Sequence, residues 1–258
     1  MPKPDGIFNG TPVWIDLNTS DIAAAGAFYA ELFGWNVPPG NEAFGGYTMA
    51  FLNDAQVGGL MPKGPDDGGM PDAWTLYLAS DDADAAAAAV KSAGGAVMLE
   101  PMDVGDFGRM AFATDPAGAA FGIWQPNTHH GFGVVAEKNA PVWFELLTRD
   151  FAASNAFYIT AFGVETAPMG DGSDGPAYNT INAGGGERAG IMDAGNGVLP
   201  EGVPSNWLVY IGVDDTDAAV AKAVDLGGSV LAPAADTPHG RFALLADPTG
   251  AAFAIISV

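Results

Sequence analysis

The chain repeats one segment at a constant offset of 129 residues. Residues 14–17 read Trp-Ile-Asp-Leu, and residues 28–34 read Phe-Tyr-Ala-Glu-Leu-Phe-Gly. In the second half, residues 143–146 read Trp-Phe-Glu-Leu, and residues 157–163 read Phe-Tyr-Ile-Thr-Ala-Phe-Gly. Such matches at one constant spacing are not expected by chance. The matching residues are a Trp, an acidic residue, a Leu, a Phe-Tyr pair and a Phe-Gly pair. The sequence therefore predicts two copies of one domain.

Each copy is itself built from a smaller pattern of one strand, one helix and three strands. Alternation of apolar and polar residues over 13–17 predicts the first strand. Apolar residues of 22–33 then recur at helical spacing, after Asp21 as the predicted N-cap and before Gly34 as the left-handed stop. The remaining predicted elements of the first copy are strands at 45–52, 56–61, 74–79, 96–99, 109–114 and 119–124 and an alanine-rich helix at 82–93.

The second copy follows the same order. Trp207 matches Trp74, and Asp-Pro-Thr-Gly at 247–250 matches Asp-Pro-Ala-Gly at 115–118. We predict an α+β fold of four βαβββ units that form two tandem domains, each with a curled mixed sheet around a cleft. The predicted boundaries are 11–125 for the first domain, 126–139 for a linker and 140–258 for the second domain.

Composition narrows the classes of function. The 258 residues are 48% hydrophobic, which is enough to build packed cores. The 31 acidic and 9 basic residues give a net charge of −22, which disfavours nucleic acid and anionic membranes as partners. This acidity fits either an ordinary solvated surface or a salt-tolerant host. Without cysteines, an apolar signal core or a membrane-length segment, the chain is predicted to be a soluble cytoplasmic protein.

The paired units, the Phe-Tyr-x-x-x-Phe-Gly helix and the Asp-Pro-x-Gly turn resemble the vicinal oxygen chelate superfamily. That superfamily includes glyoxalase I, bleomycin-resistance proteins and extradiol dioxygenases, and the resemblance extends to two-domain glyoxalase-like proteins often labelled hydroxylases. It covers residues 11–125 and 140–258. It implies the fold more firmly than the chemistry, because one fold hosts many activities.

The resemblance also implies where a metal would be held, by His and Glu side chains on the strands of each unit. At these positions the chain carries no usual metal ligand, so we expect neither a bound metal nor another cofactor. The positions fall on Trp14, Gly59, Thr75 and Gly122 in the first domain and on Trp143, Gly190, Leu208 and Ala254 in the second.

Glycine and alanine at these positions leave room, and the tryptophans add aromatic surface, so each cleft is predicted to suit a flat or apolar small molecule. Strand alternation places Asp16 beside Trp14 and Glu145 beside Trp143. An acid in such a cleft is a candidate for proton transfer, with a hydrogen-bonded structural acid as the alternative. The other candidate ligand-binding aromatic residues are Tyr77, Trp124 and Tyr210.

Three further residues are candidates for the clefts. Arg109 and Arg241 occupy matching positions, and each could pair with Asp16 or Glu145 or clamp a ligand carboxylate. His239 has no counterpart in the first copy, and it is either a proton-transferring group or a surface-loop residue. We interpret the linker pair His129-His130 as incidental.

Three functions remain open. The first is a metal-independent protein that binds an aromatic or hydrophobic metabolite. The second is a metal-independent enzyme of lyase, isomerase or hydroxylase type, which would use Asp16 or Glu145 with His239 or a tyrosine. The third is an interaction module whose clefts are closed by their tryptophans. We further expect one active cleft, a small organic molecule as partner, and a monomer or homodimer.

Overall fold

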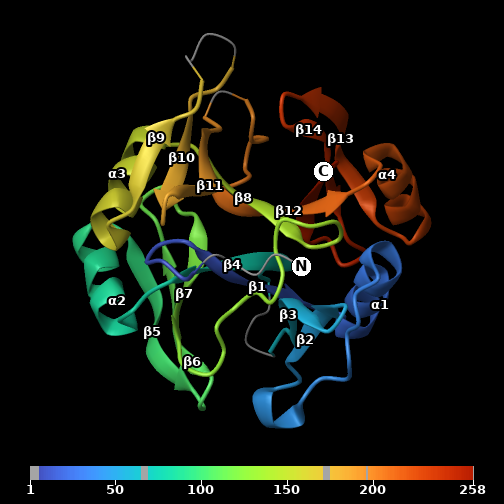
Figure 1. Ribbon diagram of the computed structural model, residues 1–258, viewed down its shortest axis with the longest axis horizontal. Coiled ribbons are helices and arrows are strands. Elements are labelled where there is room, and N and C mark those ends of the chain that lie inside the picture. Colours follow the sequence, from blue (N-terminus) through green and yellow to red (C-terminus); the bar gives the residue numbers. More distant parts are fainter. Residues whose placement is uncertain (1–5, 65–68, 171–174, 196, 258) are drawn as a thin grey trace.

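A computed structural model describes residues 6–64, 69–170, 175–195 and 197–257 and contains two mixed sheets with helices packed against them (Figure 1). The predicted α+β architecture of two tandem domains is confirmed. Domain 1 contains β1 (Pro12–Thr19), α1 (Ile22–Phe33), the short 3-10 helix η1 (Glu42–Phe44), β2 (Thr48–Leu52), β3 (Ala55–Pro62), β4 (Ala73–Ala79), α2 (Ala83–Ser92), β5 (Ala96–Val104), β6 (Gly108–Thr114) and β7 (Ala120–Pro126). Domain 2 contains β8 (Pro141–Thr148), α3 (Phe151–Phe162), β9 (Glu165–Pro168), β10 (Tyr178–Ala183), β11 (Gly186–Asp193), β12 (Asn206–Val213), α4 (Thr216–Asp225), β13 (Ser229–Thr237), β14 (Gly240–Ala246) and β15 (Ala252–Ser257).

One unit departs from the predicted pattern. After α1 the chain forms the two strands β2 and β3, whereas the equivalent unit of domain 2 forms β9, β10 and β11. The place of β9 is taken in domain 1 by a single bridge between Asn36 and Phe51. The sheet of domain 1 consequently has seven strands and that of domain 2 has eight.

The two units of each domain meet in the middle of its sheet. The strand order is β2-β3-β1-β4-β7-β6-β5 in domain 1 and β13-β14-β15-β12-β8-β11-β10-β9 in domain 2. The central pairs, β1 with β4 and β8 with β12, are antiparallel, and each is flanked by parallel neighbours. This order places the first strands of the two units side by side near the middle of each sheet.

Short-range capping explains where the helices begin and end. Asp21 accepts hydrogen bonds from two backbone amides of the first turn of α1, and Asp150 does the same with one amide of α3. Gly34 and Gly163 end these helices with φ values of 74° and 69°, in the left-handed region that costs glycine nothing. The predicted N-cap and stop of the first helix are thus confirmed.

The helices join the two domains into one body. Helix α1 contacts α4, and α2 contacts α3, so each helix pair combines one helix from each domain (Figure 1). Phe253 of β15 lies with its ring centroid 5.5 Å from that of Tyr29 and 6.0 Å from those of Phe28 and Phe33 in α1. Phe121 of β7 makes the equivalent contacts with α3. A single hydrophobic core therefore runs through both domains.

Buried polar bonds cross the same interface. Tyr29 Oη donates to Asp247 Oδ2 over 3.1 Å and accepts a hydrogen bond from Trp74 Nε1. On the opposite side, Ser154 Oγ donates to Asp115 Oδ2 over 3.0 Å. The Asp-Pro-x-Gly turn of each domain is thereby tied to the first helix of the other domain, which gives both motifs of the repeat a structural role.

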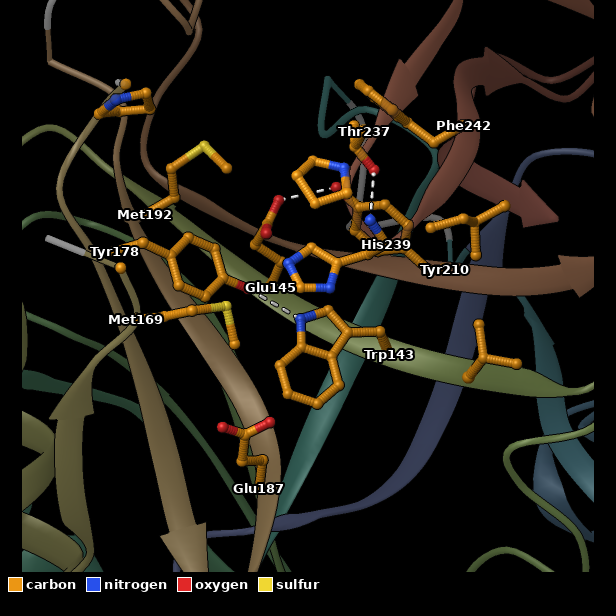
Figure 2. Close-up of a pocket in the computed structure, with 16 residues that line it drawn as sticks. Trp143, Glu145, Met169, Tyr178, Glu187, Met192, Tyr210, Thr237, His239 and Phe242 are labelled. Carbon is orange, nitrogen blue, oxygen red and sulfur yellow. Dashed lines mark hydrogen bonds between the residues drawn. The ribbon is translucent and has the colours of Figure 1, made fainter. Parts of the chain in front are cut away.

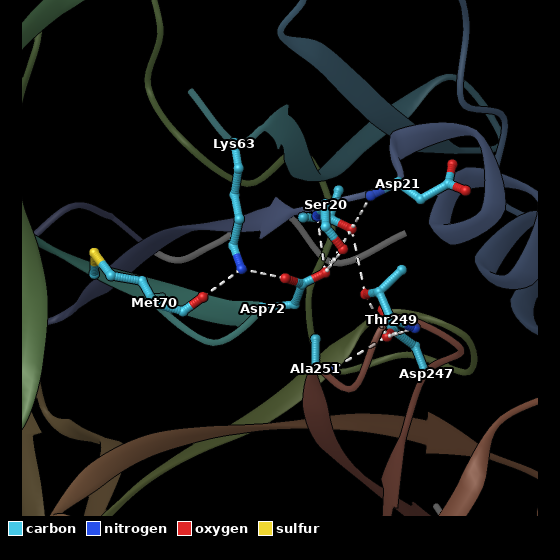
Figure 3. A network of polar contacts seen from close by, with 9 residues as sticks. Ser20, Asp21, Lys63, Met70, Asp72, Asp247, Thr249 and Ala251 are labelled. Carbon is cyan, nitrogen blue, oxygen red and sulfur yellow. Dashed lines mark hydrogen bonds and ion pairs between the residues drawn. The ribbon is translucent and has the colours of Figure 1, made fainter. Parts of the chain in front are cut away.

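Asp72 organises a second polar network beside this interface (Figure 3). Its carboxylate accepts hydrogen bonds from Ser20 N and Ser20 Oγ, over 2.8 and 2.7 Å, and from Thr19 Oγ1, and it forms an ion pair with Lys63. Thr19 Oγ1 also reaches Thr249 Oγ1 of domain 2. Burial by itself would raise the pKa of Asp72, but Lys63 and Ser20 outweigh it and hold the pKa well below its usual range.

We expect Asp72→Asn to lower the free energy of unfolding by roughly 3 kcal/mol at pH 7, because Lys63 loses a buried partner. The folded pKa of Asp72 is depressed, so its stabilisation is present above the unfolded pKa of about 4 and is lost as the pH falls below it. Urea unfolding at several pH values should show the gap between wild type and variant closing under acid conditions. Asp84→Asn, which alters an exposed ion pair, is the control; an equal loss there would contradict the prediction.

The linker between the domains is an integral part of the fold. Its Phe132 amide donates to Val13 O over 3.0 Å, and its Gly133 amide donates to Gln56 O over 2.8 Å, so the linker bridges β1 and β3 where these strands diverge. Asn139 O accepts a hydrogen bond from Trp35 Nε1. Separately, none of the helices in the described ranges has the length and apolarity to cross a membrane.

Candidate functional site

A cavity of about 730 Å³ lies on the concave face of domain 2 (Figure 2). Strands β8, β10, β11, β12, β14 and β15 contribute to its wall, together with the segments before β10 and before β14. Its surface is mainly apolar, with a small number of polar groups at the base and mouth, as is usual for small-molecule sites. The lining residues with the largest side chains are Trp143, Met169, Tyr178, Met192, Tyr210 and Phe242.

Glu145 lies at the base of this cavity with 4% of its surface exposed. Tyr210 Oη donates a hydrogen bond of 2.7 Å to Glu145 Oε2, and Tyr178, which accepts from Trp143 Nε1, also bonds to Glu145. Burial raises the pKa of Glu145, and the two tyrosine hydroxyls and the nearby His239 offset part of that rise. The predicted grouping of Trp143, Glu145 and Tyr210 on one face is therefore found in the structure.

His239 stands at the mouth of the same cavity. It is exposed, its backbone amide donates to Thr237 Oγ1 at the turn between β13 and β14, and its side chain faces the cavity that contains Glu145 (Figure 2). The structure thus brings together Trp143, Glu145, Tyr210 and His239, four of the residues singled out in the sequence.

Arg109 and Arg241 do not take part in this arrangement. Arg109 forms ion pairs with Asp84 and Asp103, and Arg241 forms equivalent pairs with Asp217 and Asp236. The predicted pairing with Asp16 or Glu145 is therefore wrong, and so is the predicted position of Arg241 in the cavity wall. The reason is strand alternation: Phe242 points into the cavity, so its neighbour Arg241 points to the opposite face, toward α4.

The donor set does not fit the metal that the fold suggests. A Cβ atom on Gly190 would lie 1.8 Å from Tyr178 Oη, and one on Gly59 would lie 2.0 Å from Tyr47 Oη. A Cβ atom on Gly122 would lie 2.2 Å from the ring of Tyr77. Tyrosine side chains thus fill the space that a ligating side chain at these glycines would need. In the described part of the chain, no three His, Asp or Glu side chains gather as a metal site requires.

Domain 1 repeats the same chemistry in a closed form. Asp16 Oδ1 accepts hydrogen bonds from Trp14 Nε1 over 2.9 Å and from Tyr47 Oη over 2.8 Å, and Tyr77 also bonds to this carboxylate. Burial raises the pKa of Asp16, against these three hydrogen bonds. Trp14 is 3% exposed and belongs to the main core, whereas Trp143 is half-buried beside the cavity of domain 2.

His129 of the linker contributes to this closure. Its imidazole packs edge-on against Trp14, with centroids 4.5 Å apart, and against Trp124, whose Nε1 donates to His129 O over 2.9 Å. Burial lowers the pKa of His129 to about 4, with a smaller contribution from the charge of His130. The interpretation of His129 as incidental is wrong, because its ring is packed between Trp14 and Trp124. The sequence did not reveal this role, since a buried ring in a linker without periodicity leaves no pattern.

Sequence reasoning also missed Tyr47 and Tyr178, the hydroxyl partners of the two cleft acids. A signal for them was present, because the two tyrosines occupy equivalent places in the two domains. Tyr47 directly precedes β2 and Tyr178 is the first residue of β10, and these strands pair with the strands that carry Gly59 and Gly190. The cavity itself contradicts the hypothesis that both tryptophans close their clefts, because the space beside Trp143 remains open.

Comparison with known proteins assigns the chain to a family. The family model described as Glyoxalase/Bleomycin resistance protein/Dioxygenase superfamily matches residues 11–123, and the Glyoxalase-like domain model matches residues 142–256. The putative glyoxylase CFP32 of Mycobacterium bovis is 44% identical over 99% of this chain and 98% of its own length. The anthracycline biosynthesis protein DnrV of Streptomyces peucetius is 39% identical over 96% of this chain and 94% of its own length.

Solved structures show the same fold at low identity. The Mn(II)-bound glyoxalase from Novosphingobium aromaticivorans superposes with a TM-score of 0.64 at 18% identity, covering 96% of this chain and 82% of its own. The 2,3-dioxygenase LapB from Pseudomonas sp. KL28 has a TM-score of 0.65 at 10% identity, covering 98% and 94%. With relatives matched over nearly their full length, the chain belongs to the glyoxalase/bleomycin resistance protein/dioxygenase superfamily.

Proposed function

We propose that this protein binds a small aromatic or hydrophobic organic molecule in the cavity of domain 2 without a metal ion. The observation that carries the proposal is the cavity of about 730 Å³, with Trp143, Tyr178, Tyr210 and Phe242 in its wall. A volume of this size is typical of sites that enclose drug-sized molecules. Flat rings of a ligand would pack against these side chains, and the polar base around Glu145 would orient it.

Two lines of evidence support a planar ligand. The aromatic and thioether side chains of Trp143, Tyr178, Met169 and Met192 offer broad, polarisable contact surface. In addition, two relatives that match along almost their whole length are named as anthracycline biosynthesis proteins. Anthracyclines are polycyclic aromatic compounds, so a fused-ring ligand suits both the wall of the cavity and the names of these relatives.

A bulky substitution in the cavity should weaken binding strongly. Met192→Trp fills the space beside Glu145, and we expect it to weaken the affinity for 1,8-dihydroxyanthraquinone by about 30-fold or more in isothermal titration calorimetry. The matched control is Met61→Trp, since Met61 occupies the equivalent position in domain 1 and is 41% exposed. Unchanged affinity in Met192→Trp, or an equal loss in both variants, would refute binding in this cavity.

Proton transfer by Glu145 is the second candidate function. It is favoured by one observation, the raised pKa of a buried carboxyl group that faces a substrate-sized cavity with His239 at the mouth. Mass spectrometry after incubation with bound compounds separates the two functions. Turnover that disappears in Glu145→Gln while binding persists would establish an enzyme, and unchanged compounds would leave a binding protein.

A further inference from the structure

We propose that the domain 2 cavity selects ligands with a positive charge, such as an ammonium group attached to an aromatic body. This inference rests on the proposed function, because it specifies the charge of the molecule that the same cavity binds. Four features support it: the isolated carboxyl group, the surrounding rings, the charge of the chain and the contrast with domain 1.

The carboxyl group of Glu145 has no strongly basic partner among the described residues that line the cavity. Its hydrogen bonds come from the neutral hydroxyls of Tyr210 and Tyr178. The described lining residues include no Lys or Arg, and Arg241 of β14 points away from the cavity and is engaged by Asp217 and Asp236. A buried carboxylate is costly unless a cation compensates it, so a cationic ligand would supply what the protein itself does not.

The rings around Glu145 would strengthen the attraction. Trp143, Tyr178, Tyr210 and Phe242 line the same space, and Figure 2 shows the first three grouped around the carboxyl group. The face of an aromatic ring attracts a cation within about 6 Å, and Trp is the most effective ring. A carboxylate surrounded by rings is therefore a suitable site for an amine and an unfavourable one for an anion.

The charge of the whole molecule acts in the same direction. The net charge of −22 favours the approach of cations and disfavours that of anions. Glu187 adds a second acid to the wall, where its side chain is exposed. Because salt screens charges that lie far from the cavity, the net charge mainly affects the rate at which a ligand associates. Glu145, in direct contact with the bound ligand, would determine the charge of the ligand group at the base of the cavity.

Domain 1 carries the equivalent carboxyl group, that of Asp16, with a different set of hydrogen-bond donors. Asp16 accepts from Trp14, Tyr47 and Tyr77, so the indole donates directly to the acid. Trp14 Nε1 also lies within hydrogen-bond distance of Tyr47 Oη, at 3.0 Å, whereas the indole of Trp143 in domain 2 donates to Tyr178. Glu145 is thus held by tyrosine hydroxyls where Asp16 also accepts from an indole, and Glu145 lies in the wall of the cavity.

Binding of a cation should depend on pH. The titratable groups that act on Glu145 are Tyr178 of β10, Tyr210 of β12 and His239 at the turn before β14, and Glu187 of β11 lines the same cavity. Burial raises the pKa of Glu145, so acid conditions neutralise the group that attracts the cation. This effect predicts that the affinity for an amine rises with pH until the amine itself loses its proton.

The test compares molecules of one shape on the full-length protein. At pH 8, calorimetry should show 1-naphthylmethylamine binding at least about tenfold more tightly than 1-naphthalenemethanol, with 1-naphthoate weaker than both. As the pH is lowered from 8, the advantage of the amine should shrink while the alcohol is unaffected. Glu145→Gln should equalise the amine and the alcohol within about twofold, whereas Asp84→Asn, which removes an exposed acid outside the cavity, should retain the preference.

The outcomes separate this inference from the proposed function. If amine and alcohol bind equally to the wild-type protein at pH 8, the charge selection is wrong and the proposed function stands. If none of the three naphthalenes binds, both are wrong. The pH series uses the unmodified protein, so the inference remains testable even if Glu145→Gln does not fold.

Discussion

Replacing Phe253 by alanine is expected to lower the free energy of unfolding of the whole chain by about 4 kcal/mol. Phe253 belongs to domain 2, is fully buried, and packs against Phe28, Tyr29 and Phe33 in domain 1. Its removal would leave a cavity between the domains that neither can fill by a small shift. Because the contacts cross the interface, the loss should affect both domains in one unfolding transition.

Thermal and urea unfolding measure this effect. For a chain of this length, the expected change corresponds to a fall in melting temperature of about 10 °C. Phe121→Ala should have a similar effect, because Phe121 makes the equivalent contacts with Phe157, Tyr158 and Phe162. Phe107→Ala is the control, since Phe107 is 37% exposed. Two separate transitions, with domain 1 unaffected by Phe253→Ala, would show that the domains are energetically independent.

A second large effect is expected at Gly131 in the linker. This glycine has a φ of +91°, and a Cβ atom there would lie 2.1 Å from Val13 O and 2.6 Å from Val13 Cγ2. Gly131→Ala therefore combines an unfavourable backbone conformation with overlap against backbone atoms that cannot rotate away. We expect a loss of about 3 kcal/mol or more in the free energy of unfolding.

Gly118→Ala separates the two contributions. Gly118 has nearly the same φ, +89°, but a Cβ atom there would have no neighbouring atom within 4 Å. This variant should lose only about 1 kcal/mol, the cost of a left-handed alanine. Urea unfolding of both variants gives the comparison. Equal losses would mean that the linker moves away from β1 at no cost, and that its contact with Val13 contributes little.

The strands and helices could be predicted because their causes are local. The hydrophobic alternation of β1, the N-cap Asp21 and the stop Gly34 each act within a few residues, and the structure contains all three. The general pattern of three strands per unit did not hold in the first unit, where the sequence shows two strand segments after the helix and the Asn36–Phe51 bridge stands in place of β9. Strand pairing is a property of the tertiary structure and leaves a weak signal in a short segment.

The site was predictable only in part. Alternation along β8 correctly placed Glu145 beside Trp143, and the repeat correctly indicated Tyr210. The different character of the two clefts was not predictable, since the sequences of β1 and β8 are almost interchangeable. What distinguishes them is the packing of a linker residue, His129, against Trp14, and that contact depends on the path of a segment without periodicity.

The aromatic residues Trp14, Tyr77 and Trp124 on the concave face of domain 1 belong to the continuous core, while the concave face of domain 2 surrounds a cavity. If the repeat arose by duplication, this difference would allow residues of the domain 2 cavity to change without loss of the packing that domain 1 provides. Amino-acid replacements along the open wall would alter chemical preference while the closed half continued to hold the molecule together. Divergence among homologues should accordingly concentrate at positions such as Met169, Met192 and Phe242, and spare Trp14, Tyr77 and His129.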